Sequence, residues 1–213
     1  MASEIDNSKN NILQMNQRFG SYLPVIVDIE TGGVVCETDA ILELSASYLR
    51  LDKHGILHAS EPDTYHVLPF KGANLNPKAM AIHGIDPYHP FRFAKEEGEI
   101  LEAFYAVVWE KVKAAGCRRA TLVGHNAHFD LNFLNAANKR EKIKDSPFHA
   151  FTCLDTATLG AVFYGKTVLA SALQVAGIPY NKDEAHAASY DVDVTAKLFC
   201  KIINEHPKFC VET

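Results

Sequence analysis

The sequence has no Cys-x-x-Cys pair, and its five cysteines are odd in number. This pattern argues against a disulfide framework and against a zinc site, and it is typical of a reducing cytoplasm. Apolar runs of the ~20 residues that a membrane span needs are also missing. The polar N-terminus lacks the apolar core of a signal peptide. The sequence therefore predicts a cytoplasmic protein without a membrane partner.

An excess of positive charge is missing too, since the formal net charge is −5. Nucleic-acid binders are usually basic, but a cluster of metal-binding carboxylates would itself add negative charge, so this value excludes little. With 213 residues, 47% apolar and 22% charged, the chain is most simply one domain. We expect a polar tail or short helix over residues 1–20, a single domain over 21–205 and a tail over 206–213.

The order of patterns predicts an α/β fold. Three alternating or apolar segments separated by short turns indicate an antiparallel meander, and alternating strands and helices follow. The expected strands cover residues 24–28, 40–51, 64–68 and 121–123. The expected helices cover residues 77–83, 96–115, 128–140, 154–163, 169–176 and 188–204. We therefore expect a mixed sheet, three strands of it antiparallel, with helices packed on it.

The first strand ends in two acids spaced by one residue, Asp28 and Glu30. Side chains alternate across a strand, so both acids project from one face and Ile29 from the other. Two carboxylates at the end of an apolar strand repel each other and are costly to desolvate. A divalent cation would turn this arrangement into a site.

Two more acids lie at predicted helix starts. Asp130 is on the first turn after a buried strand, where an acid also simply complements the helix dipole. Asp191 opens the last helix, and because Asp193 points ~160° away from it, only one of the two can face the sheet. His186 precedes Asp191 by five residues. On a continuous helix this spacing would place the two side chains ~140° apart. If they cooperate, His186 must lie on the loop before the helix, a position that suits a proton carrier.

Together, these residues resemble the DEDDh family of 3′-to-5′ exonucleases, in which four acids and a histidine recur. The matching pieces are D-x-E-T-G from Asp28, H-N-x-x-F-D ending at Asp130, and H-x(4)-D from His186 to Asp191. The tyrosine variant of the family would have Tyr at Ala187. The resemblance implies a ribonuclease H-like fold.

Further motifs resemble the ribonuclease T branch of that family, over roughly residues 18–205. They include the segments 30–33, 38–43, 72–75, 83–87, 147–149, 154–157 and 185–191. This resemblance implies a homodimer that trims the 3′ ends of tRNA and other stable RNAs, and that also acts on single-stranded DNA.

The resemblance also implies a mechanism with two Mg²⁺ ions, for which Mn²⁺ can substitute. Asp28 would bridge both ions, Glu30 and Asp191 would complete the first, and Asp130 would support the second. His186 would act as general base, and the product would be a nucleoside 5′-monophosphate. Oxygen ligands without cysteine suit these hard cations.

Base stacking would fall to Phe129 and Phe151, which match family stacking positions, although core aromatics are the plainer alternative. Two other family positions depart from the pattern, because Val34 and Ile82 are aliphatic here. Basic residues form two clusters near predicted helix ends, where they either complement dipoles or track phosphates. By resemblance, the residues of a patch that feeds RNA to the partner subunit would be Arg18, Lys113, Arg119 and Lys144.

Three alternatives remain open from the sequence. A proofreading subunit of a DNA polymerase and an oligoribonuclease share the acids and the fold, but not the inner motifs. An inactive nucleic-acid-binding module on this fold is a different class. The presence of all four acids and the histidine weighs against it.

Overall fold

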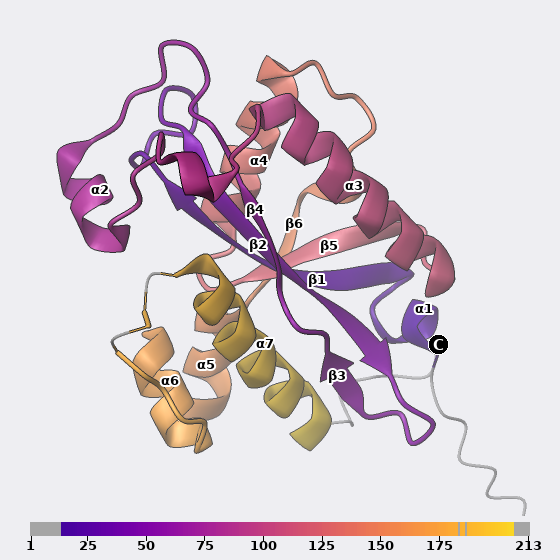
Figure 1. The fold of residues 1–213 in the computed structure, drawn as a ribbon. Helices are drawn as coiled ribbons and strands as arrows, with labels where there is room; N and C mark the ends of the chain where they lie inside the picture. The colour runs from indigo at the N-terminus through magenta and orange to yellow at the C-terminus, as the bar shows by residue number, and fades with distance from the viewer. Residues whose placement is uncertain (1–13, 183, 186, 207–213) are drawn as a thin grey trace, which may run out of the picture.

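The computed structural model describes residues 14–182, 184–185 and 187–206, and Figure 1 shows their arrangement. A mixed sheet forms the centre, with strand order β3-β2-β1-β5-β6, and β4 also pairs with β2. This agrees with the predicted mixed α/β fold.

The central strand is β1 (Tyr22–Thr31), which contains the two acids. It pairs antiparallel with β2 (Ile41–Leu51) and parallel with β5 (Arg119–Gly124). Val25, Ile26 and Val27 are almost completely buried, because both faces of the strand are covered. The apolar run therefore forms the middle of the core.

The third strand of the predicted meander is divided in two. β3 (Leu57–Ala59) pairs with the end of β2, and β4 (Asp63–His66) pairs with its beginning. Pro62 lies between them, and a proline cannot donate a backbone hydrogen bond to a sheet. The strand expected over residues 64–68 is thus only the second half of this edge.

Helices cover both faces of the sheet (Figure 1). On one face lie α3 (Glu97–Ala114) and α4 (His128–Arg140). On the other lie α5 (Thr156–Tyr164), α6 (Leu169–Ala176) and α7 (Ala188–Glu205), and α7 packs directly on β1 and β2. The remaining elements are α1 (Met15–Arg18), α2 (Pro77–His83) and the 3₁₀ helix Pro90–Arg92. No single helix among the described residues is long and apolar enough to cross a membrane. Only α5 and α6 taken together, as a bent pair, reach that length and composition.

Besides the short β3, the strand β6 (Phe148–Asp155) was not predicted, and it extends the sheet beside β5. The sequence suggested a connection here, followed by a helix from Leu154. The helix begins at Thr156 instead, because the Asp155 carboxylate accepts hydrogen bonds from Ala157 N and Thr158 N and so ends the strand with a cap. A bulge in β6 disrupts the alternation by which a strand is recognised.

Candidate metal centre and nucleic-acid interface

Three carboxylates from two elements converge at the end of β1. Asp28 and Glu30 project toward α7, and Asp191, on the first turn of that helix, joins them. Oxygen atoms of the three lie within 4.8 Å of one another. Asp193 points elsewhere and pairs with Lys197 at 2.5 Å, as the helical spacing predicts.

Asp130 approaches the cluster from α4. It is 4% exposed, and its Oδ1 accepts a hydrogen bond from Ile29 N at 3.1 Å, so the helix is tied to the strand between the two acids. These carboxylates open into a cavity of about 290 Å³. The other lining residues are Ile29, His125, Asn126 and Phe129.

Burial and mutual repulsion make these acids reluctant to ionise. Desolvation, with the charges of Asp191 and Glu43, raises the pKa of Asp28 to about 8. Desolvation, followed by the charges of Asp28, Asp191 and Glu43, raises the pKa of Glu30 to about 9. The pKa of Asp130 is also raised, chiefly by burial and next by Asp28. A cation in the cavity would offset all three shifts.

Glu43 is a neighbour of the cluster that the sequence did not reveal. It lies opposite Glu30 in the antiparallel ladder of β1 and β2, and residues directly opposite each other share a face. His66 Nδ1 lies 3.1 Å from Glu43 Oε2, an ion-pair distance without hydrogen-bond alignment. The pairing register alone brings Glu43 to the site.

The donor set fits a divalent metal ion. Among the described residues lining the cavity, none is Lys or Arg, so none of these residues brings the permanent positive charge that would balance the acids. Carboxylate oxygens are the ligands that hard divalent ions prefer. The acidic cluster can therefore bind metal.

The loop from β5 to α4 is fixed by Asp155 and His125. Asp155 Oδ2 accepts a hydrogen bond from Ala127 N at 3.0 Å. His125 bonds Thr156 Oγ1 through Nδ1 at 3.0 Å and Thr167 O through Nε2 at 2.9 Å. These contacts hold the segment that leads into Phe129 and Asp130. The H-N-x-x-F-D motif was visible in the sequence, but the residues that bond His125 and Ala127 are distant in the chain.

The loop after β1 is equally fixed. A Cβ on Gly33 would lie 1.9 Å from Asp39 Oδ2, so only glycine fits there. Asp39 is buried, yet the bonds from Val35 N and from the Asn74 and Thr38 side chains outweigh that burial and lower its pKa. Val34, which follows Gly33, is 78% exposed at the tip of this loop.

The four predicted base-contacting residues do not lie in one place. Phe129 lines the cavity and packs on Phe133 with ring centroids 4.9 Å apart. Val34 and Ile82 are exposed on neighbouring segments, since His83 Nε2 lies 3.2 Å from Thr31 O. Phe151 is 75% exposed but does not line the cavity.

The predicted basic patch lies at the opposite end of the sheet. Arg119 pairs with Tyr22 at the start of β1, and Asp28 follows Tyr22 by six positions, which is about 20 Å of strand. Lys113 and Lys144 are exposed. Arg119 donates to Ser146 O at 2.8 Å and is therefore partly structural.

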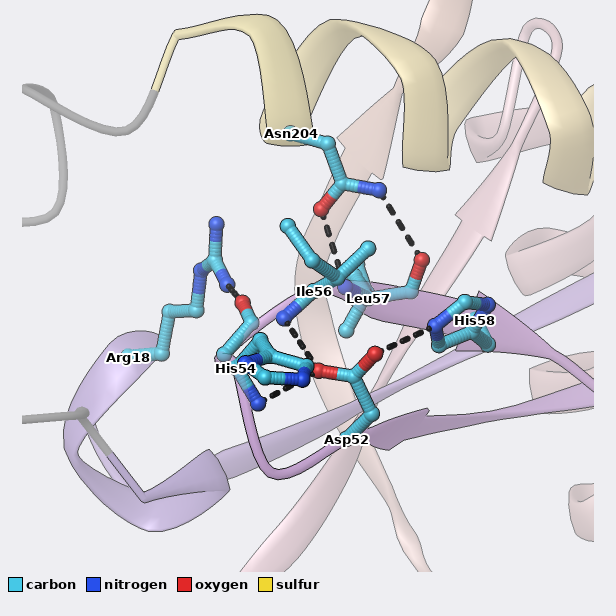
Figure 2. Close-up of polar contacts among 8 residues, drawn as sticks. Arg18, Asp52, His54, Ile56, Leu57, His58 and Asn204 are labelled. Carbon is cyan, nitrogen blue, oxygen red and sulfur yellow. Dashed lines mark hydrogen bonds and ion pairs between the residues drawn. The ribbon is translucent and has the colours of Figure 1, made fainter.

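Arg18 has a structural role that the sequence did not indicate. Its guanidinium donates to Gly55 O at 2.7 Å and to Ile203 O at 3.3 Å. Figure 2 shows this side chain reaching the β2–β3 hairpin, while Asn204 of α7 bonds Leu57 N and O on the same hairpin. His186, the predicted general base, lies outside the described residues.

Comparison with known proteins agrees with this geometry. A family model described as Exonuclease matches residues 25–199. Ribonuclease T of Vibrio parahaemolyticus is 48% identical over 198 residues, covering 92% of each chain. Ribonuclease T of Yersinia enterocolitica is 46% identical over 200 residues, covering 94% of this chain and 93% of that protein.

Solved structures show the same fold. A full-length 3′-exonuclease superposes with a TM-score of 0.67 at 19% identity, covering 88% of this chain and 83% of that one. Escherichia coli Exonuclease I in complex with a dT13 oligonucleotide gives a TM-score of 0.66 at 17% identity. There the match covers 88% of this chain but only 42% of Exonuclease I.

The fold and the acidic cluster thus define a 3′-to-5′ exonuclease. Within that class, the chain belongs to the ribonuclease T family, because its identity to curated members extends over nearly the whole of both sequences.

Proposed function

We propose that this exonuclease trims the 3′ ends of tRNA and other stable structured RNAs, also accepts single-stranded DNA, and releases nucleoside 5′-monophosphates in the cytoplasm. The observation that carries the proposal is the convergence of Asp28, Glu30 and Asp191 beside Asp130. The kinship to ribonuclease T supports the RNA substrate.

The site would use two Mg²⁺ ions, with Mn²⁺ as a substitute. Asp28, Glu30 and Asp191 would hold one ion, and Asp28 with Asp130 the other. Bound there, such ions polarise the phosphate, generate a nucleophile from water and stabilise the leaving oxygen. The roles of the individual acids follow from the family resemblance together with their shared cavity.

The side chains of the protein would contribute proton transfer and binding of the terminal bases. His186 would take the proton of the attacking water, since imidazole titrates near neutral pH. Phe129, at the cavity wall, would stack on a terminal base. Val34 and Ile82 would cover base faces with aliphatic surface, because both are exposed near the end of β1.

A metal-dependence assay tests this proposal. Purified protein is given a tRNA-like hairpin with an unpaired 3′ end, a DNA duplex with a 3′ mismatch and a dinucleotide, with Mg²⁺ or with chelator. We expect mononucleotide release from the hairpin that requires Mg²⁺ and is lost in Asp28→Asn and His186→Ala. Preference for the mismatch or the dinucleotide would favour a proofreading subunit or an oligoribonuclease, and no release would indicate a binding module.

We also propose a homodimer in which the basic patch of one subunit presents RNA to the site of the other. The patch and the acids lie about 20 Å apart along β1, which supports a role in trans. Mixing Asp28→Asn with Lys113→Ala/Lys144→Ala subunits tests it. One intact site facing one intact patch should restore part of the activity, whereas a monomer or unrestored activity would contradict the dimer.

A further inference from the structure

The edge strand β6 contains a bulge that exposes an aromatic ring. Between the pairs Ala120↔Phe148 and Leu122↔Cys153, β5 advances by two residues and β6 by five. The additional residues leave the ladder, and Phe151 among them is 75% exposed. Bulges of this kind re-aim side chains next to functional sites.

Side chains, rather than a neighbouring strand, form hydrogen bonds with the backbone N–H and C=O groups of the bulge. His149 Nδ1 accepts hydrogen bonds from Phe151 N at 3.4 Å and Thr152 N at 3.0 Å. Asn135 Nδ2 donates to Ala150 O at 2.9 Å, and Thr121 Oγ1 donates to Thr152 O at 3.2 Å. With its backbone groups bonded in this way, the bulge is a built feature and not a frayed edge.

His149 is also held between two rings. Its ring meets Phe151 edge-on with centroids 4.4 Å apart, and it meets Tyr22 edge-on at 5.5 Å. The Arg118 guanidinium lies 5.7 Å from the centre of the Tyr22 ring. A row of aromatic rings, with the Arg118 cation at its end, thus leads from Phe151 to the start of β1.

We propose that His149 is a positioning residue that presents Phe151 to an unpaired nucleotide of the nucleic-acid substrate. Because both neighbours of Nδ1 are N–H donors, that nitrogen acts purely as an acceptor, and it shapes the turn that carries Phe151. The occupant is an unpaired nucleotide, because stacking on an exposed ring tolerates any base, and Arg118, at the Tyr22 end of the row of rings, complements a phosphate. This inference rests on the proposed function and on the stacking role that the family resemblance implies for Phe151, and it adds the residue that holds this ring in place.

Two substitutions separate the acceptor from the ring. His149→Phe keeps a ring but loses the acceptor, whereas His149→Asn keeps an acceptor in the same place, since Asn side chains bond N–H groups two and three residues on. We expect His149→Phe to raise KM for a substrate with an unpaired 3′ strand about tenfold, with kcat unchanged, as removal of one stacked base would. His149→Asn should restore most of the affinity. An unchanged KM in His149→Phe, or a worse KM in His149→Asn, would overturn the proposal.

A double variant and a control complete the experiment. If His149 acts through Phe151, adding His149→Phe to Phe151→Leu leaves KM as it is in Phe151→Leu alone, and additive effects would overturn the assignment. The control is His58→Phe, since His58 bonds Asp52 at 3.0 Å on the β2–β3 hairpin (Figure 2), and β3 and β6 lie at opposite ends of the strand order. Its KM should equal that of the wild type. If the wild type itself releases no mononucleotide with Mg²⁺, the proposed function is refuted instead.

Discussion

At the residue scale, Asp191 and Asp193 form a natural matched pair. Both are on α7, but only Asp191 reaches the carboxylates of β1, while Asp193 pairs with Lys197 at the surface. We expect Asp191→Asn to lower kcat/KM about 100-fold or more, because a metal ligand contributes several kcal/mol to transition-state stabilisation.

Asp193→Asn should change kcat/KM less than about twofold, since an exposed ion pair contributes little. Steady-state assays of both variants under one set of Mg²⁺ concentrations provide the comparison. Equal losses in the two would mean that the acidic cluster does not define the site.

Phe129 lines the cavity of the acidic cluster, where we propose that a terminal base stacks on its ring. Replacing it by Val should raise KM about tenfold with a smaller effect on kcat, because stacking on one ring contributes ~1–3 kcal/mol per base. Phe133→Leu is a suitable control for packing, since that ring touches Phe129 but is buried behind it. An unchanged KM and rate in Phe129→Val would assign this ring to the core.

At the element scale, Arg18 joins three elements that are far apart in sequence. It connects α1 to the β2–β3 hairpin through Gly55 O (Figure 2) and to the end of α7 through Ile203 O. We expect Arg18→Ala to lower the free energy of unfolding by about 1–3 kcal/mol, because the charged donor is lost and its acceptors are left without it. Urea denaturation measures this change.

The matched control is Lys113→Ala, an exposed residue of the same predicted patch. It should leave stability nearly unchanged while weakening RNA binding and reducing its salt dependence. If Arg18→Ala weakened RNA binding without any loss of stability, Arg18 would be a phosphate contact, as the family resemblance implied.

At the scale of the whole molecule, the buried acids link folding to metal binding. The folded chain places mutually repelling carboxylates together, and the unfolded chain separates them, so a divalent ion favours the folded state. At a Mg²⁺ concentration of 100 Kd, we expect a gain of about 2.7 kcal/mol in the free energy of unfolding relative to chelator.

Thermal unfolding with and without Mg²⁺, at constant ionic strength, measures this gain. Asp28→Asn should show a much smaller Mg²⁺ effect, because it removes the acid that we expect to contact both ions. A wild-type melting temperature that does not respond to Mg²⁺ would rule out a metal centre at these acids.

Local patterns in the sequence determined much of this protein. The period of two placed Asp28 and Glu30 on one face, and the helical period allowed only one of Asp191 and Asp193 to face the sheet, because both periods depend only on neighbouring residues. The first two strands and the long helices followed from the same periodicities, to within a few residues at their ends, whereas the third strand of the meander is divided and β3 was missed.

Only the tertiary structure decided what depends on pairing between distant segments. The register of β1 and β2 brought Glu43 to the acids, and the bulge in β6 exposed Phe151. The contacts of Arg18 gave this residue, a predicted RNA contact, a structural role as well. Register, bulges and contacts of this kind are set by partners far away in the chain, so no local spacing could have revealed them.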